Sequence, residues 1–532
     1  MGNAVGNLQD YWNEIYSNPR LLGGFIWEWC DQGLHRTDAD GKTFTAFGGD
    51  FGDIPNHGGF CIKGLVNADR EIFPKYWEVK KVYQPVAIGP VNLQPGNVAV
   101  RITNRNSFVN LNTFQARWSV TDSDGREIQS GVLAPVDCAP GKACTVKIPV
   151  KKIRHAQSGM EFWLRVGFHT LTDCAWSPVG FEIAWQQFKL EVKTPAATEA
   201  NTGDGPPLTV TQQAGRVLVA NARFTVGFSR ETGTLDQYSF NLAGFGEVLA
   251  PGDPPAMNGL QLWRAPTDND KGFGKWLARD WREAGLTNLS RQVDEFTIHA
   301  LTTGEVRIRT VVTDRATNDG VRSETIWTVR RDGSVEMDTD FQPFGKLPLL
   351  PRMGVVFCLD RFYDRLKWYG RGPWENYPDR KESADMGVWS GSVDGQYVPY
   401  VRPQENGNKE DVRWLVLSGA TVAGGATADG RDQGLLIESM DRPFSFSALH
   451  FTAGDLASVR HNAELRPRPE VILSLDAKQS GLGNSSCGPG VLAKYSVPPK
   501  EYRLHLKFSP VPTAATPVQP ELRNWGARPP RA

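Results

Sequence analysis

The chain has 532 residues, and its 59 lysines and arginines equal its 59 aspartates and glutamates in number. This length is too great for one ordinary domain and indicates roughly three. Because the charges balance, no overall field favours nucleic acid or an anionic membrane surface as a partner. A neutral, polyhydroxylated partner fits better, and some of the 17 tryptophans are candidates for stacking on sugar rings.

Cysteine spacing and hydrophobicity exclude several classes of protein. The seven cysteines show no CxxC spacing and no histidine pattern, so neither a zinc site nor a disulfide framework is predicted. No apolar run comes close to the length of about 18 residues that a membrane helix needs, and the first residues show no signal-peptide pattern. The cytoplasm is therefore the default location, although a chain that began within a domain would have lost any export signal.

The first 85 residues show an α/β pattern. Apolar residues at the spacing of a helix face precede Pro19, namely Leu8, Tyr11, Trp12, Ile15 and Tyr16. The apolar run at 22–29 predicts a buried parallel strand, and residues 74–83 predict a second helix. Helix, buried strand and helix form the end of an α/β unit, and the pattern changes after this single unit.

From residue 86 onward, short β-branched and aromatic runs alternate with turn residues and predict antiparallel strands, for example at 98–103 and 116–120. The predicted fold class is therefore mainly β. The expected domains, in chain order, are an α/β segment at 1–85, a sandwich at 86–193, a linker at 194–207, a large two-sheet domain at 208–510 and a disordered tail at 511–532.

Several long strings distinguish the chain from a generic β-protein. They are GFIWEWCDQ at 24–32, GGDFGD at 48–53, FCIKGLV at 60–66, ADR at 68–70, RAPTDND at 264–270, GRGPWENYPDR at 370–380, PQENG at 403–407, SFSA at 445–448 and GLGNSSCGP at 481–489. Together they closely resemble the large bacterial β-galactosidases of glycoside hydrolase family 2. The resemblance covers residues 1 to about 510 in order.

The resemblance implies a specific architecture. Residues 1–85 would be the truncated end of a TIM barrel, residues 86–193 an Ig-like β-sandwich, and residues 208–510 the large C-terminal β super-sandwich of this family. In the family, the nucleophilic glutamate lies in a string reading E-Y-A-H-A-M-G-N, and this chain opens with Met1-Gly2-Asn3. We therefore expect both catalytic glutamates to be absent from this chain. The magnesium ligands would be absent too, so magnesium, with sodium as a second candidate, would be a cofactor of the intact enzyme only.

The implied activity is the retaining hydrolysis of terminal β-D-galactosides such as lactose, with the chain inactive by itself. The intact enzyme is expected to be a homo-oligomer without nucleic-acid or membrane partners. Two alternatives remain. One is a non-catalytic carbohydrate-binding or assembly protein, and the other is an enzyme of the same family acting on another sugar, such as a glucuronidase or mannosidase. The super-sandwich motifs argue against the second alternative.

Glu28 and Asp31 are the acids that most resemble a catalytic pair. Retaining hydrolysis needs two carboxylates about 5–5.5 Å apart, one to attack and one to protonate the leaving oxygen. Catalytic groups of TIM barrels converge from several different strand ends, whereas these two acids lie three residues apart on one run. We therefore favour a structural role for both.

The resemblance places the substrate-binding residues elsewhere. Trp27 corresponds to an aromatic platform for the galactosyl ring, and Phe60 to a residue that contacts a bound sodium and moves with the loop containing Glu405, Asn406 and Gly407. From the residues alone, Trp27 and Phe60 would both be interpreted as core aromatics.

Two positions depart from the best-known members of the family. Lys63 stands where those members have an asparagine ligand to sodium, and an ammonium group cannot coordinate a cation. Cys487 stands where they have a second platform tryptophan, and a substrate contact and a small buried hydrophobe are equally compatible with it. The charged residues of the other strings are interpreted as structural clamps, namely Asp268, Asp270, Arg371, Glu375 and Arg380.

Overall fold

The structure is a computed structural model that describes residues 2–154, 156–195, 205–241, 246–250, 258–272, 276–300, 304–419 and 433–512. It divides into two compact units. The first contains Met1–Tyr76, Asn201–Lys381 and Trp389–Ala532, and the second contains Trp77–Ala200 and Glu382–Val388. Most of the predicted linker, and the predicted tail beyond Pro512, lie outside the described residues. Among the helices that are described, none has the length and apolar character needed to cross a bilayer.

The segment at 2–82 contains both predicted helices. Helix α1 (Leu8–Ser17) ends just before Pro19, and helix α2 (Pro74–Val82) starts at a proline, a residue that suits the first turn of a helix. Between them lies a hairpin that the sequence pattern did not predict, formed by β1 (Leu34–Thr37) and β2 (Thr43–Ala46).

The prediction of a buried strand over 22–29 is wrong. Leu22 and Phe25 are fully exposed, and Trp27 and Trp29 are 76% and 60% exposed. The end of the run, Glu28 and Trp29, forms backbone hydrogen bonds with residues 63–66, and a parallel bridge joins the next residue, Cys30, to Val66. A parallel strand is stable when neighbours cover both of its faces, and the apolar side chains at the start of this run lack that cover in the described chain.

The second unit is an antiparallel β-sandwich. One sheet contains β3 (Val86–Asn92), β4 (Ala99–Asn104) and β7 (Ala143–Lys147), and the other contains β6 (Glu127–Val132), β5 (Phe114–Asp122), β8 (Phe162–Thr170) and β9 (Glu182–Lys189). The strands predicted at 98–103 and 116–120 are confirmed as β4 and β5. Alternate residues of β5, including Trp118 and Val120, pack into the core between the two sheets.

The rest of the first unit is formed by three antiparallel sheets. A four-stranded sheet contains β10 (Thr209–Gln212), β11 (Arg216–Ala220), β12 (Phe224–Ser229) and β13 (Leu235–Phe240). A five-stranded sheet contains, in spatial order, β14 (Gly259–Gln261), β19 (Arg352–Leu359), β26 (Val471–Gln479), β25 (Phe444–Leu449) and β22 (Lys409–Val412). Two short helices, α3 (Leu277–Glu283) and α4 (Ala453–Ser458), lie in the connections.

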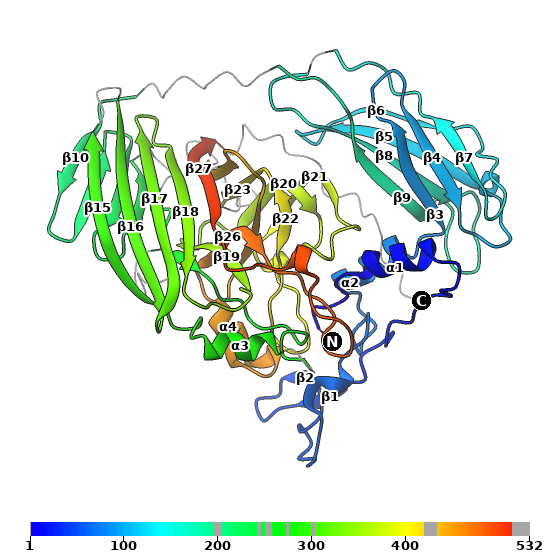
Figure 1. Cartoon of the computed structure of the whole chain (residues 1–532), viewed down its shortest axis with the longest axis horizontal. Helices are drawn as coiled ribbons and strands as arrows, with labels where there is room; N and C mark the ends of the chain where they lie inside the picture. Colours follow the sequence, from blue (N-terminus) through cyan, green and yellow to red (C-terminus); the bar gives the residue numbers. More distant parts are fainter. Residues whose placement is uncertain are drawn as a thin grey trace. The chain divides into compact units, whose positions relative to one another are not determined.

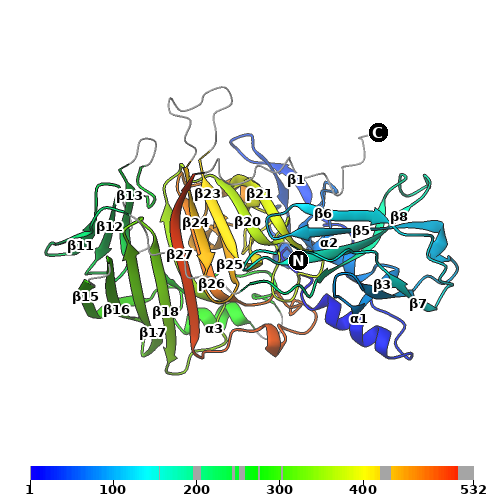
Figure 2. The same ribbon diagram turned by 90° about the horizontal axis from the view of Figure 1, so that it is seen from above.

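The largest sheet has nine strands (Figures 1 and 2). In spatial order they are β15 (Ser290–Ala300), β16 (Glu305–Ala316), β17 (Asp319–Arg330), β18 (Val335–Phe344), β27 (Tyr502–Pro512), β24 (Gln433–Ser439), β23 (Trp414–Ser418), β20 (Arg365–Gly372) and β21 (Asp385–Ser392). The tail was predicted to start at residue 511, but pairing of Val511 and Pro512 with β24 extends the last strand to Pro512.

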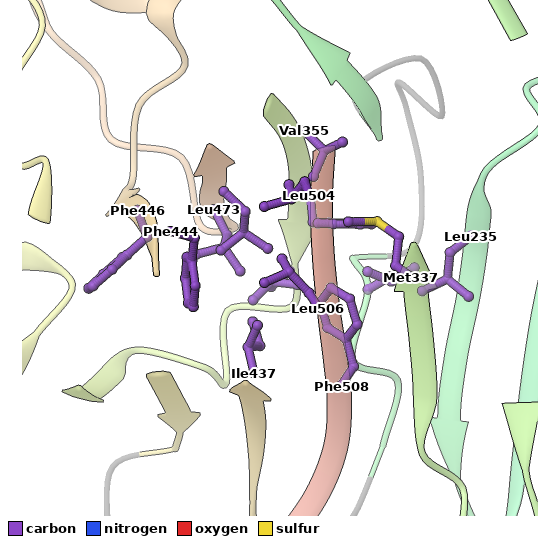
Figure 3. Close-up of a cluster of buried hydrophobic side chains, with 14 of the residues drawn as sticks. Leu235, Met337, Val355, Ile437, Phe444, Phe446, Leu473, Leu504, Leu506 and Phe508 are labelled. Carbon is purple, nitrogen blue, oxygen red and sulfur yellow. The ribbon is translucent and has the colours of Figure 1, made fainter. Parts of the chain in front are cut away.

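The core of the first unit joins these sheets. Side chains from the nine-stranded sheet, such as Ile437, Leu506 and Phe508, meet Phe444 and Leu473 of the five-stranded sheet (Figure 3). Every residue of β25 is buried, which is expected for a strand covered on both faces. This rigid framework supports the loops described next.

Candidate functional site

Two of the strings form one structural feature in the first unit. The segment at 28–31 runs beside the segment at 63–66, and the backbone N–H groups of Glu28, Leu65 and Val66 donate across it at 3.0–3.2 Å. This pairing brings Glu28 next to Lys63, whose ammonium group also faces the Phe60 ring, and the preceding residue, Trp27, is exposed. We call Trp27, Glu28, Phe60 and Lys63 the Trp27 cluster.

The ammonium group of Lys63 is the cation of this cluster. Its Nζ lies 3.6 Å from Glu28 Oε1 and 4.6 Å from the centre of the Phe60 ring. The Lys63 side chain is only 13% exposed, so this charge is held inside the cluster rather than in bulk water. The cluster therefore does not fit a bound sodium ion, because its carboxylate and its aromatic face already contact a covalently attached cation.

Lys63→Asn is expected to create a sodium site, because it removes the ammonium group and leaves the Glu28 carboxylate beside an amide oxygen. Sodium-23 NMR of the chain should show line broadening for the variant and none for the parent. Lys42→Asn, which changes an exposed lysine of the β1–β2 turn, is the matched control. If the parent and Lys63→Asn broaden the sodium-23 signal equally, the ammonium group of Lys63 does not take the place of a bound sodium ion.

Glu28 and Asp31 have structural partners. Gln32 donates to Glu28 Oε2 at 2.9 Å, and the backbone N–H of Gly64 donates to Asp31 Oδ1 at 2.6 Å. Asp31 is buried, and burial raises the pKa of its carboxyl group. These contacts support a structural role for both acids, as expected from the sequence.

The loop around Glu405 is buried rather than open. Tyr377 donates to Glu405 Oε1 at 3.4 Å and Gln479 donates to the same atom at 3.2 Å, while Arg352 Nη1 lies 3.8 Å from Glu405 Oε2. Burial raises the pKa of Glu405 to about 7. Asn406 and Gly407 bind the neighbouring backbone and Glu375, and a positive φ of 82° suits the glycine.

The charged residues of the other strings are confirmed as clamps. Arg264 forms a bidentate pair with Asp270, and both side chains are almost completely buried. Arg380 pairs with Glu375 at 2.6 Å, and Arg402 pairs with Asp268 at 3.1 Å. Arg371 donates to Asp411 at 2.5 Å. Such charge-assisted pairs fix the loops that carry them.

The sequence did not predict that these charged residues hold Gly2 and Asn3 in place. The Gly2 N–H donates to Asp268 at 2.9 Å, and the Asn3 N–H donates to Gln404 at 3.0 Å. Arg380 donates to Asn3 Oδ1 at 2.7 Å, and the buried Lys75 donates to the Gly2 carbonyl at 2.9 Å. Burial lowers the pKa of Lys75 to about 8. The clamp therefore fixes the backbone next to Met1.

The structure brings some of the predicted site residues together and leaves others apart. Trp27, Phe60 and Lys63 share one cluster, and Glu405, Asn406 and Gly407 share one buried loop. Cys487 is exposed on the loop at 481–490, where its N–H donates to Asn484 at 3.2 Å. Within the described residues, nothing connects Cys487 to the Trp27 cluster.

Comparison with protein families accounts for nearly the whole chain. Residues 220–508 match the family described as "Beta galactosidase small chain", and residues 100–191 match "Beta-galactosidase, domain 4". Residues 1–88 match "Glycosyl hydrolases family 2, TIM barrel domain". The chain belongs to the β-galactosidases of glycoside hydrolase family 2. The family assignment made from the sequence strings is thus confirmed, and so is the mainly β fold class with the end of a TIM barrel at its N-terminus.

Curated relatives agree with this family. A β-galactosidase of Priestia megaterium is 34% identical over 91% of this chain and 44% of its own length. A β-galactosidase of an Arthrobacter species is 32% identical over 96% of this chain and 49% of its own length. The chain therefore spans about half the length of these relatives. Among solved structures, a galactose 1-epimerase of Lactobacillus acidophilus aligns with a TM-score of only 0.27 at 9% identity, a likeness too weak to support an inference.

Proposed function

We propose that this chain forms the C-terminal part of a β-galactosidase that hydrolyses terminal β-D-galactosides with retention of configuration. The observation that carries the proposal is Trp27, which is 76% exposed and directly precedes Glu28, the partner of Lys63, in the sequence. An aromatic face next to fixed charges is typical of a sugar site, because the ring packs on C–H groups while polar groups bind hydroxyls.

In this proposal the chain binds and positions the sugar. The two reacting carboxylates come from the other part of the intact enzyme, which corresponds to the half of the relatives' length that this chain does not cover. Retaining hydrolysis needs a nucleophile and an acid about 5–5.5 Å apart. Glu28 is paired with Lys63 and Gln32, and Asp31 is buried against Gly64, so we assign neither to these roles. Trp27 would orient the galactosyl ring, and Lys63 would supply the fixed positive charge beneath it.

The magnesium cofactor and the oligomeric state of the intact enzyme are also proposals. Among the described residues, no three His, Cys, Asp or Glu side chains are grouped as metal ligands, so we assign no catalytic step in this chain to magnesium. We place magnesium binding with the carboxylates of the intact enzyme. Homo-oligomerisation of that enzyme stays a prediction, and lactose is the simplest substrate of the proposed class.

Trp27→Ala is expected to weaken galactoside binding by roughly tenfold in the assembled enzyme, since stacking on an indole contributes about 1–2 kcal/mol. Titration calorimetry with a non-hydrolysable thiogalactoside measures this change. Trp176→Ala removes another exposed tryptophan, in the second unit, and should leave the affinity unchanged. If Trp27→Ala lowers the melting temperature but keeps the affinity, Trp27 is only a packing residue.

The alternative of a non-catalytic carbohydrate-binding protein keeps the same sugar contact but removes turnover. Both proposals predict that Trp27→Ala weakens binding. They differ in the assembled enzyme, where the alternative predicts binding of a chromogenic galactoside without release of its chromophore.

A further inference from the structure

The first unit contains a polar cavity that shares no residue with the Trp27 cluster. Its volume is about 500 Å³, within the range of about 300–1,000 Å³ that small-molecule sites occupy. Its walls come from β18, the end of β26, the start of β27 and the turn between β24 and β25. Strands of both large sheets therefore form this cavity, and the Phe341–Tyr502 pair of β18 and β27 lies in its wall.

Two ion pairs fix one wall. Arg503 donates two hydrogen bonds of 2.7 Å to Asp338, and His505 Nε2 lies 2.6 Å from Glu336. The Tyr502 hydroxyl donates to the Pro498 carbonyl at 2.9 Å, which holds the half-buried ring in place. The wall is therefore ordered before any ligand arrives, which lowers the entropic cost of binding.

Six charged side chains of the cavity remain without an ion pair among the described residues. Three are cations and three are anions: Arg442, Lys478, Lys500, Asp340, Asp441 and Glu501. Burial and the neighbouring Lys500 lower the pKa of Lys478, while burial and the neighbouring Asp338 raise the pKa of Asp340. The cavity therefore offers both hydrogen-bond donors, such as Lys478 and Lys500, and hydrogen-bond acceptors, such as Asp340 and Glu501.

This balance of charge selects the ligand class. An anion would be attracted by three side chains and repelled by three others, and the same holds for a cation. Hydroxyl groups, by contrast, donate and accept at once and can satisfy both groups. The Tyr502 ring adds an aromatic surface for the C–H face of a sugar.

We propose that this cavity is a saccharide-binding site for a neutral, polyhydroxylated oligosaccharide. The site would hold a carbohydrate chain on the protein surface, away from the residues of the Trp27 cluster. This inference does not rest on the proposed hydrolysis, because it concerns binding by the chain itself.

The test is titration of the 532-residue chain with a neutral galactosyl-lactose trisaccharide, followed by NMR or calorimetry. Lys478→Met combined with Lys500→Met should raise the Kd about tenfold or more, since hydrogen bonds from charged donors are lost. Asp340→Asn should weaken binding in the same direction. Lys507→Met, on the same strand as Tyr502, is the matched control and should change the Kd less than twofold.

Further controls separate this site from the Trp27 cluster and from an anion site. Lys478→Met combined with Lys500→Met should raise the Kd by the same factor in the Trp27→Ala background as in the parent, and inorganic phosphate should not compete. Because the ligand is neutral, the Kd should not change between low and high salt. Melting temperatures of all variants confirm that they fold. The inference is overturned if the chain binds no trisaccharide, if the cavity variants leave the Kd unchanged, or if phosphate occupies the cavity instead.

Discussion

Arg264→Ala is expected to destabilise the first unit by about 3–5 kcal/mol, because it leaves a buried carboxylate without its cation. Arg264 is completely buried, donates to Asp270 at 2.8 and 3.1 Å, and also donates to the carbonyls of Ser480 and Gly481. Urea unfolding followed by tryptophan fluorescence measures the loss. Trp281, whose ring centre lies 5.5 Å from the Arg264 guanidinium carbon, is a local reporter.

Two comparisons make this prediction specific. Arg468→Ala breaks a bidentate pair with Asp455 in which both side chains are partly exposed, and it should cost only about 0–1 kcal/mol. Arg264→Met combined with Asp270→Leu removes both buried charges and should recover most of the stability that Arg264→Ala loses. A loss for Arg264→Ala no greater than that for Arg468→Ala would contradict the assignment of Arg264 as a clamp.

The second large effect is a gain of β-galactosidase activity on mixing. A polypeptide with the N-terminal sequence of the family, ending in E-Y-A-H-A, is expected to bind this chain and produce turnover that neither part shows alone. Burial of Leu22, Phe25 and Trp29, which are 102%, 103% and 60% exposed here, would drive the association. The contacts of Gly2 with Asp268 and of Asn3 with Gln404 would hold the first residues of this chain in place as the two parts assemble.

Charge substitutions identify the surface that is used. Leu22→Asp combined with Phe25→Asp alters side chains that contact solvent in this chain, so its own melting temperature should not change. The variant should nevertheless need at least tenfold more N-terminal polypeptide for half-maximal activity, since charges are excluded from a buried interface. Phe108→Asp, at a 94% exposed position of the second unit, is the control and should assemble normally.

Local pattern predicted two helices and several strands correctly. The apolar face before Pro19 identified α1, and alternation of apolar and polar residues identified β4 and β5. The run at 22–29 has the composition of a buried strand but is exposed. Composition reports what a segment can bury, whereas burial also requires neighbours, and those neighbours are not among the described residues.

The candidate site was predictable only in part. Long strings predicted Trp27, Phe60 and Lys63 as site residues, and in the structure Lys63 contacts Phe60 and Glu28 while Trp27 is exposed. The family resemblance described the loop at Glu405 as a loop near the site, and in the structure the Glu405 side chain lies in a buried network with Tyr377, Gln479 and Arg352. The clamp joins Gly2 to Asp268, and Asn3 to Gln404 and Glu405, across 266 to 402 positions of sequence. No local pattern predicts contacts of that separation.

The most direct test of the whole account is the hydrolysis of a chromogenic β-galactoside by the purified 532-residue chain alone. The account predicts a rate equal to that of buffer, because the chain offers a sugar-binding surface but no free pair of reacting carboxylates around Trp27. Glu28→Gln should then change nothing in this assay. Robust turnover by the chain alone, abolished by Glu28→Gln, would contradict the account and make Glu28 a catalytic residue.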